Sequence, residues 1–191
     1  MAQPIFRSRF PGSLMILGEH AVLRGHPAIA TSTSRSIQCQ LTPRSDQLIQ
    51  IKSQLGYLSV PIDQIKIEPP FQFILATIQS MSSVLVSGFD LEIQSEFSSQ
   101  LGLGSSAAIT AATHVVLWNW LQRPYQAQDL LQHSGSIIRS IQGQASLTDL
   151  AASIFQGIIH YCPNRPTITR YDMKLPLTAI YCGYKTPTSE V

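Results

Sequence analysis

Charged residues are scarce in this chain of 191 residues. Lys, Arg, Asp and Glu together make up 13% of it, about half of the roughly 25% that is usual in globular domains. The formal net charge is +2, and the lysines and arginines form no run, so nothing indicates binding to nucleic acid or to an anionic membrane. Because only 11 carboxylates exist, acid–base or metal chemistry must draw on a short set that includes Glu19 and Asp149.

Paired cysteines and long apolar runs are also lacking. Cys39, Cys162 and Cys182 are odd in number, widely spaced and without a CxxC pair, which argues against a disulfide framework or a zinc site. We expect them to be buried thiols in a reducing cytoplasm. No stretch reaches the roughly 20 apolar residues of a membrane span, and the N-terminal MAQPIFRSRF does not resemble a signal peptide. With 44% apolar residues, the chain is expected to be a globular cytoplasmic protein.

What the first hundred residues do contain is a series of strand patterns. Short runs rich in Ile, Val, Leu and aromatic residues are separated by Pro and Gly, as in strands joined by turns. These runs are FRSRF, SLMIL, AIATS, SIQCQLT, LIQIKS and YLSVPI. FDLEIQSEF, residues 89–97, alternates apolar and polar positions and is predicted to be a half-buried strand.

Helical patterns interrupt and then follow these strands. Pro69-Pro70 is expected to open a helix over residues 71–86, where apolar residues recur at helical spacing. Three more helices are predicted, over residues 106–121, 127–142 and 148–155.

Two strands are predicted after the helices. GIIHYC at residues 157–162 and TAIYCGY at 178–184 are expected to pair with each other. The helix at 148–155 is expected to be capped by Thr148 or Ser146. Strands, then helices, then strands predict an α+β fold, with the helices on one face of a mixed sheet.

The segment GLGSSAA, residues 102–108, is the first candidate site. Glycines permit backbone angles and close approaches that side chains forbid, and Ser105 or Ser106 is expected to cap the following helix. Its free amides and dipole would then suit a di- or triphosphate, and the hydroxyl of Ser106 could ligate magnesium.

Taken alone, this segment is equally compatible with an ordinary Gly-Ser turn before an Ala-rich helix. It matches neither GxxxxGK[ST] nor GxGxxG. The predicted phosphate-binding residues are Gly102, Leu103, Gly104, Ser105, Ser106 and Ala107.

A second candidate lies in PGSLMILGEHAVLRGHPAIA, residues 11–30. Glu19 and His20 follow a predicted strand directly, and an acid beside an imidazole can bind the hydroxyl and carboxylate groups of a small polar substrate. Taken alone, an exposed Glu-His pair at a turn is the simpler interpretation.

Together, PGxxxxxGEHAVxxGxPA and GLGSSAA resemble the first two motifs of the GHMP kinases, and GEHAVLRGHPAIA is most similar to the mevalonate kinases. The resemblance implies a ribosomal protein S5 domain 2-like fold, the cofactors ATP and Mg2+, and an alcohol substrate contacted by Glu19 and His20. GQASLTDLAASIFQG, residues 143–157, resembles the family's third block, GxxSGxD, and this resemblance implies that Asp149 is the catalytic base.

The sequence departs from the family pattern at four positions. Ser13 stands where the family usually has a lysine, and Ile138 stands where mevalonate kinases have a magnesium-binding glutamate. Leu147 and Gln156 replace expected glycines. Arg7, Arg9, Arg24 or Lys185 is the expected replacement for the missing lysine.

The resemblance also implies a C-terminal ferredoxin-like lobe, which is largely missing. Thr188-Ser189-Glu190 resembles the first turn of a helix, so we expect a nucleotide-binding domain over residues 1–185 and the start of a truncated lobe at 186–191. Without that lobe, we expect the chain alone to turn over little, and a homodimer or a partner to cover the site.

The function implied is an ATP-dependent kinase that phosphorylates the primary hydroxyl of mevalonate. Phosphomevalonate kinase or another GHMP kinase is the alternative within the enzyme class. Ser13 and Ile138 favour a different alternative, a non-catalytic relic of the fold that at most binds nucleotide.

Overall fold

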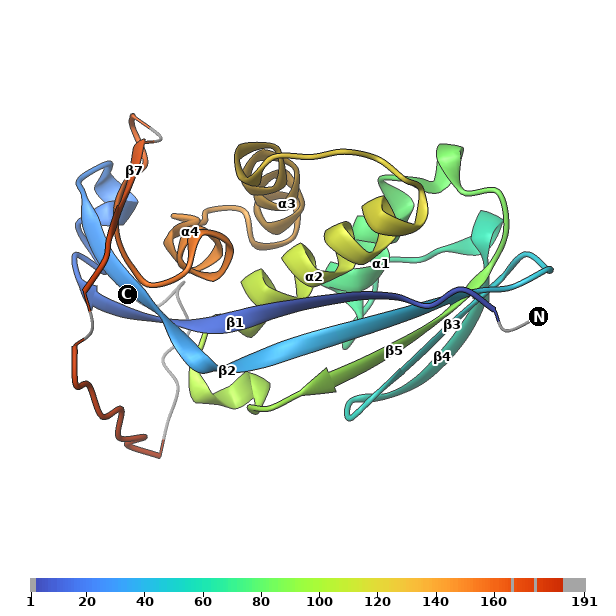
Figure 1. Cartoon of the computed structure of the whole chain (residues 1–191), viewed down its shortest axis with the longest axis horizontal. Helices are drawn as coiled ribbons and strands as arrows, with labels where there is room; N and C mark the ends of the chain where they lie inside the picture. The colour runs from blue at the N-terminus through green and yellow to red at the C-terminus, as the bar shows by residue number, and fades with distance from the viewer. Residues whose placement is uncertain (1–2, 166, 174, 184–191) are drawn as a thin grey trace.

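Two long antiparallel strands run through the structure. The computed structural model describes residues 3–165, 167–173 and 175–183 (Figure 1). Strand β1, Phe6–Leu17, pairs with β2, Ala28–Pro43. Each strand joins two of the predicted runs, because β1 continues past Pro11 and Gly12 through an irregularity in its register with β2.

The described residues contain a mixed sheet of seven strands. Its order is β4-β3-β5-β2-β6-β7, with β1 also paired to β2. Only the pairing of β3 with β5 is parallel among the described pairs. The remaining strands are β3 (Leu48–Ser53), β4 (Gly56–Pro61), β5 (Phe89–Ser95), β6 (Ile158–Cys162) and β7 (Thr167–Tyr171).

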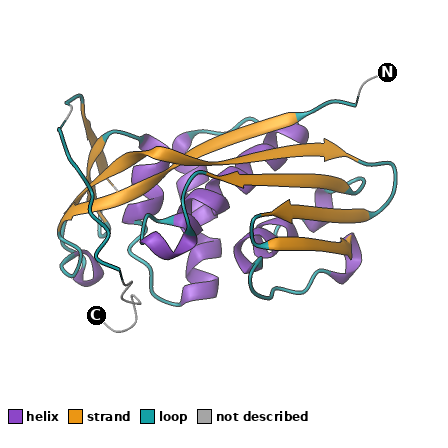
Figure 2. Cartoon of the chain, turned by 90° about the horizontal axis from the view of Figure 1, so that it is seen from below, coloured by secondary structure: helices purple, strands orange, loops and turns teal. Residues whose placement is uncertain are grey.

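The α-helices cover one face of this sheet, as predicted for an α+β fold (Figures 1 and 2). They are α1 (Gln72–Gln79), α2 (Ser105–Trp120), α3 (Ala127–Gln142) and α4 (Thr148–Phe155). Helix α2 lies between the sheet and the other helices, and 11 of its 16 residues are buried. No helix in the described ranges is long and apolar enough to cross a membrane.

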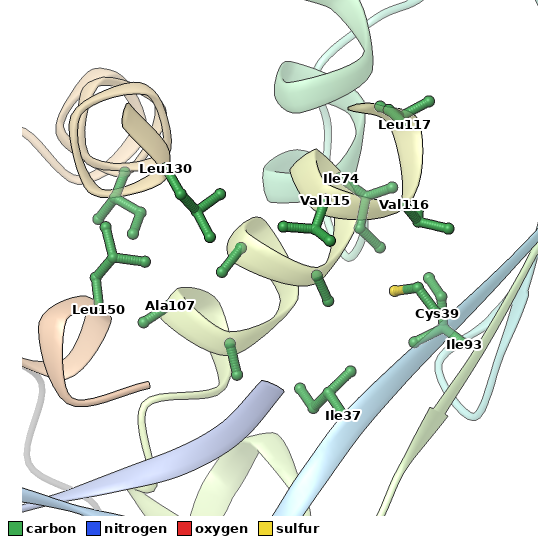
Figure 3. Packing of buried hydrophobic residues seen from close by; sticks show 14 of the residues in the cluster. Ile37, Cys39, Ile74, Ile93, Ala107, Val115, Val116, Leu117, Leu130 and Leu150 are labelled. Atoms are coloured by element: carbon green, nitrogen blue, oxygen red, sulfur yellow. The ribbon is translucent and has the colours of Figure 1, made fainter. Parts of the chain in front are cut away.

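The core forms between the sheet and α2 because alternate strand residues point to opposite faces. On β2, Ile37 and Cys39 are buried whereas Gln38 is exposed. Figure 3 shows residues of β2 facing α2. It also shows Leu130 of α3 and Leu150 of α4 beside the first turn of α2, so apolar packing holds the starts of α2 and α4 close together.

Two predicted elements differ from the structure. Helix α1 ends at Gln79 instead of reaching residue 86, and a short 3-10 helix, Ser82–Val84, follows. The hydroxyl of Ser80 donates to the Thr77 carbonyl at 2.7 Å, a local bond that competes with continued helix.

The predicted pairing of GIIHYC with TAIYCGY is wrong. Strand β6 pairs with β2 on one side and with β7 on the other, because β7 follows it after a short turn. Residues 178–183 form neither helix nor strand. The predicted start of a second lobe at 186–191, including Thr188-Ser189-Glu190, lies outside the described residues.

Candidate functional site

The glycine loop leads directly into α2. Gly102 and Gly104 both have positive φ, 72° and 63°. Gly104 is the N-cap of α2, and no side chain of the described residues caps it, so the prediction that Ser105 or Ser106 caps this helix is wrong. Both serines lie inside the first turn.

This geometry leaves donors at the start of α2. The first helical hydrogen bond runs from the Ala108 amide to the Gly104 carbonyl at 3.0 Å. The amides of Ser105, Ser106 and Ala107 precede it, and amides in the first turn have no partner within the helix. They lie at the positive end of the helix dipole, which makes this end of α2 suited to an anion.

Asp149 lies in the first turn of α4, next to this loop. The Ser13 hydroxyl donates to Asp149 Oδ1 at 2.8 Å, and the Ser13 amide donates to the Leu103 carbonyl at 3.0 Å. A Cβ added to Gly104 would clash with the Ser13 hydroxyl and lie 3.2 Å from Asp149 Cβ. Strand β1, the loop and α4 therefore meet at one place, and Ser13 is buried at its centre.

Glu19 and His20 lie in a different setting. Both are exposed in the turn after β1, before the 3-10 helix Val22–Arg24. Neither side chain forms a hydrogen bond or ion pair with another described residue. Unlike Asp149 and the loop, they are not joined to the cluster around Ser13, and their contact with substrate stays a prediction.

Comparison with known proteins shows which family the chain resembles. The GHMP kinases N terminal domain matches residues 71–157. A mevalonate kinase of Methanocaldococcus jannaschii is 26% identical over 81% of this chain, and one of Saccharolobus solfataricus is 25% identical over 96%. The chain is thus similar to the GHMP kinases in its N-terminal domain. It spans 53% and 60% of the lengths of these two relatives, so it matches little more than half of each.

Solved structures of GHMP kinases share the fold. The mevalonate kinase of Methanococcus jannaschii superposes with a TM-score of 0.78 at 22% identity, over 90% of this chain and 56% of its own. A galactokinase of Lactococcus lactis gives 0.77 at 20% identity, over 86% and 46%. The fold predicted from the sequence is thus confirmed.

The lysine that GHMP kinases usually carry is not replaced by Arg7 or Arg9. Between them, Ser8 points toward the helices and donates to the Ala112 carbonyl at 2.7 Å. The two arginines therefore point to the helix-free face seen in Figure 2. There Arg7 donates to Gln40, and Arg9 donates to Ser36 and Glu96.

The other two candidates do not replace the lysine either as far as the structure describes them. Arg24 is exposed at the end of the 3-10 helix Val22–Arg24, and Lys185 lies outside the described residues. The group that occupies the lysine's place is the Ser13 hydroxyl itself, which is already bonded to Asp149.

Ile138, which stands where a glutamate is expected, is an apolar residue of the core. It is 4% exposed and packs in the core, so no carboxylate is presented from that position. The nearby polar side chains are exposed on α3, and Ser136 donates to the His133 carbonyl at 2.7 Å.

The two residues that stand where glycines are expected both have positive φ. Leu147 has φ 64° and Gln156 has φ 55°, a region that side chains other than glycine enter at a cost. Leu147, rather than Thr148 or Ser146, is the N-cap of α4. The Ser146 hydroxyl accepts only a long bond of 3.3 Å from the Thr148 amide.

Other ionisable groups serve packing. His114 is buried, and its Nδ1 lies 3.2 Å from the Thr110 carbonyl and 3.0 Å from the Ser134 hydroxyl. Burial lowers its pKa to about 4. Trp118 packs against His114 with ring centroids 5.3 Å apart, as expected for a core residue. Within the described ranges, no three His, Cys, Asp or Glu residues gather as metal ligands.

The three cysteines differ from one another. Cys39 is buried, and burial raises its pKa to about 12, which makes it a poor nucleophile. Cys162 is half-buried and Cys182 is exposed. The prediction of buried thiols is therefore correct for Cys39 and wrong for Cys182.

Proposed function

We propose that this chain supplies the nucleotide-binding half of an ATP-dependent kinase that phosphorylates the primary hydroxyl of mevalonate. One observation carries the proposal: the free amides at the start of α2 lie beside a carboxylate, Asp149, on the first turn of α4. Phosphoryl transfer requires an anion cradle next to a group that can accept the proton of the attacking hydroxyl. The relatives at 25–26% identity are mevalonate kinases, which supports mevalonate over other alcohols.

In this mechanism the loop Gly102–Ala107 binds the phosphates of ATP through its amides. Asp149 accepts the proton of the substrate hydroxyl while its oxygen attacks the γ-phosphorus and the bond to the β,γ-bridging oxygen breaks. ADP leaves with the bridging oxygen. The Ser13 hydroxyl donates to Oδ1 of Asp149 and so orients the carboxylate. Glu19 and His20 contact the polar groups of mevalonate.

Magnesium fits this donor set in a limited way. Mg2+ commonly takes one or two protein oxygens and completes its shell with phosphate oxygens and water. The Ser106 hydroxyl, on the first turn of α2, is the protein oxygen that would hold it, and Ile138 presents no carboxylate to add a second. When bound, the ion neutralises charge on the transferred phosphoryl group.

Calorimetric titration of the chain with ATP and Mg2+ tests the nucleotide site. We expect saturable binding that Ser106→Ala weakens, most of all in the presence of Mg2+. The matched control is Ser99→Ala, in the 3-10 helix before the loop, which should leave the affinity unchanged. Binding that does not respond to Ser106→Ala would remove this serine from the site.

Transfer is tested by mevalonate-dependent release of ADP. We expect little turnover by these 191 residues alone, because they span little more than half of the mevalonate kinase relatives, and water that enters an unclosed site weakens charge stabilisation. A second copy or a partner that closes the site would raise the rate with protein concentration. Any transfer measured with the protein in excess should fall by about 10²–10⁴-fold in Asp149→Asn. An unchanged rate would refute the role of Asp149 as the base.

Phosphomevalonate and other alcohols, tested in parallel with mevalonate, decide which acceptor the kinase uses. A cytoplasmic location, where ATP is available, stays a prediction.

A second function is favoured by two residues. Ser13 cannot neutralise phosphate charge as a lysine would, and Ile138 contributes no metal ligand. These departures favour a module that binds ATP without transferring its phosphate. Binding of ATP with no ADP release at any concentration of mevalonate, even with the protein in excess, would support that function over the kinase.

A further inference from the structure

Leu147 occupies a backbone position that costs it energy. Its φ of 64° and ψ of 10° lie in the left-handed region, where the side chain of an L-residue is crowded against its own backbone. Nevertheless the residue is 8% exposed and belongs to the core. The side chain must therefore make contacts that offset the strain.

Gly135 provides the space for those contacts. It lies inside α3, where glycine is less favourable than alanine, and it is buried. A Cβ added to Gly135 would lie 2.6 Å from Leu147 Cδ1 and 3.6 Å from Cδ2. The strained Leu147 thus packs against Gly135. The glycine leaves room for the leucine side chain, and the packing offsets the strain of the leucine backbone.

This contact lies at the start of α4. The Leu147 carbonyl accepts from the Ala151 amide at 2.9 Å, the first helical bond of α4. Asp149 lies two residues after Leu147, and its carboxylate accepts from Ser13 beside Gly104. A shift of Leu147 would move the first turn of α4, and Asp149 with it.

We propose that the packing of Leu147 against Gly135, called the lock below, fixes the start of α4 and so positions Asp149 beside the glycine loop. Leu147 is a positioning residue and contacts no reacting atom. The part that Asp149 plays in catalysis rests on the proposed function, whereas the lock itself does not.

A double-mutant cycle tests the contact. In the natural chain Gly135→Ala must displace the buried Leu147, so the gain in helix propensity is lost to overpacking and Tm should stay level or fall. In a Leu147→Gly background the methyl group has room, and the same substitution should raise Tm by roughly 2–4 °C. Equal effects of Gly135→Ala in the two backgrounds would overturn the lock.

A second measurement separates positioning from mere packing. In Leu147→Ala, which keeps the strained backbone and loses the contact, the backbone amide resonances of Ser13 and Gly104 should shift. Gln156→Gly is the matched control, because it relieves a positive φ at the other end of α4 where the side chain is exposed. It should raise Tm and leave those resonances in place.

The outcomes also separate this inference from the proposed function. If Leu147→Ala lowers Tm but leaves the Ser13 and Gly104 resonances unchanged, Leu147 only fills space and the positioning proposal fails. If those resonances shift while the chain binds no ATP, the lock holds and the proposed function fails. In a chain that binds ATP, we expect Leu147→Ala to weaken binding and Leu147→Gly/Gly135→Ala to restore part of the loss.

Discussion

The starts of α2 and α4 have the same backbone geometry but different residues. The N-cap of each helix is left-handed, Gly104 at φ 63° and Leu147 at φ 64°, and neither accepts a side-chain cap bond. Glycine adopts this conformation freely. Leucine does so at a cost and packs against Gly135. The left-handed N-cap of α2 is thus stabilised by the conformational freedom of its glycine, whereas that of α4 is stabilised by packing against α3.

This difference matches what each start provides. At α2 the backbone amides are the functional groups, so any side chain on Gly104 would occupy the space of Ser13. At α4 a side chain, Asp149, is the functional group, and its place depends on how firmly the helix is anchored. We therefore expect a larger side chain at Gly104 to disrupt the start of α2, and a smaller side chain at Leu147 to loosen the start of α4.

The largest effect is expected from Gly104→Ala. The new Cβ would be strained by positive φ and would clash with the Ser13 hydroxyl, at a combined cost of about 2–4 kcal/mol. Chemical denaturation gives this loss, and ATP titration should show binding abolished. Gly102→Ala is the control, since its φ is also positive but a Cβ there meets nothing within 4 Å. It should cost only about 1 kcal/mol, and an equal loss in both variants would contradict a steric role for Gly104.

The next largest effect on stability comes from a buried histidine in the middle of α2. Its titration sets the lowest pH at which the stabilities of variants at the two helix starts can be compared. Burial lowers the pKa of His114 to about 4, with His133 and Arg123 adding unfavourable positive charge. The unfolded chain, with a histidine pKa near 6.5, binds the proton first as pH falls. Stability is therefore full above about pH 6.5 and decreases by about 3 kcal/mol as pH falls toward 4.

Denaturation midpoints measured between pH 4 and 7.5 check this dependence. In His114→Gln, which has no titratable group, the decrease between pH 6.5 and 4 should become much shallower. A slope that is unchanged in this variant would show that other groups cause it. Comparisons between the two helix starts are best made above pH 7.

The helix starts also show where prediction from sequence succeeds. The sequence places α2, α3 and α4 within a residue of their observed bounds, because helix propensity and the absence of Pro, as in the Ala-rich run of α2, are local properties. Asp149 and the loop could be singled out from family motifs. The caps could not, since serines next to glycine resemble caps, and only the left-handed Gly104 moves both serines inside the helix.

What sequence could not predict depends on contacts distant in the chain. Ser13 reads as a lost lysine, and only the fold brings its hydroxyl to a carboxylate 136 residues away. From the sequence alone, Gly135 is only an unfavourable residue inside a helix, and its packing against Leu147 is visible only in the structure. Strand patterns likewise do not specify partners, so the sequence predicts that TAIYCGY pairs with β6, whereas β7 pairs with β6 in the structure.

The hydrogen bond that joins the two starts is expected to have an intermediate effect. Ser13→Ala removes a buried donor from a carboxylate, which should cost about 1.5–3 kcal/mol. Ser8→Ala is the control, because Ser8 lies on the same strand and donates to a neutral backbone carbonyl at 2.7 Å. It should cost about 0.5–1.5 kcal/mol. Urea denaturation of both variants measures the difference, and a larger loss for Ser8→Ala would mean that the bond to Asp149 adds nothing to stability.

The smallest effect is expected from two buried threonine hydroxyls, one in each helix, that differ in hydrogen bonding. Thr148 Oγ1, at the start of α4, is buried with no hydrogen-bond partner among the described residues, and a buried unpaired hydroxyl is destabilising. Thr148→Val keeps the shape and should stabilise the protein by about 1 kcal/mol. In α2, Thr110 Oγ1 donates to the Ser106 carbonyl at 2.6 Å, so Thr110→Val should be neutral or destabilising. Thermal denaturation of the pair decides the matter, because a gain at Thr110 equal to that at Thr148 would mean that pairing of the hydroxyl does not distinguish the helices.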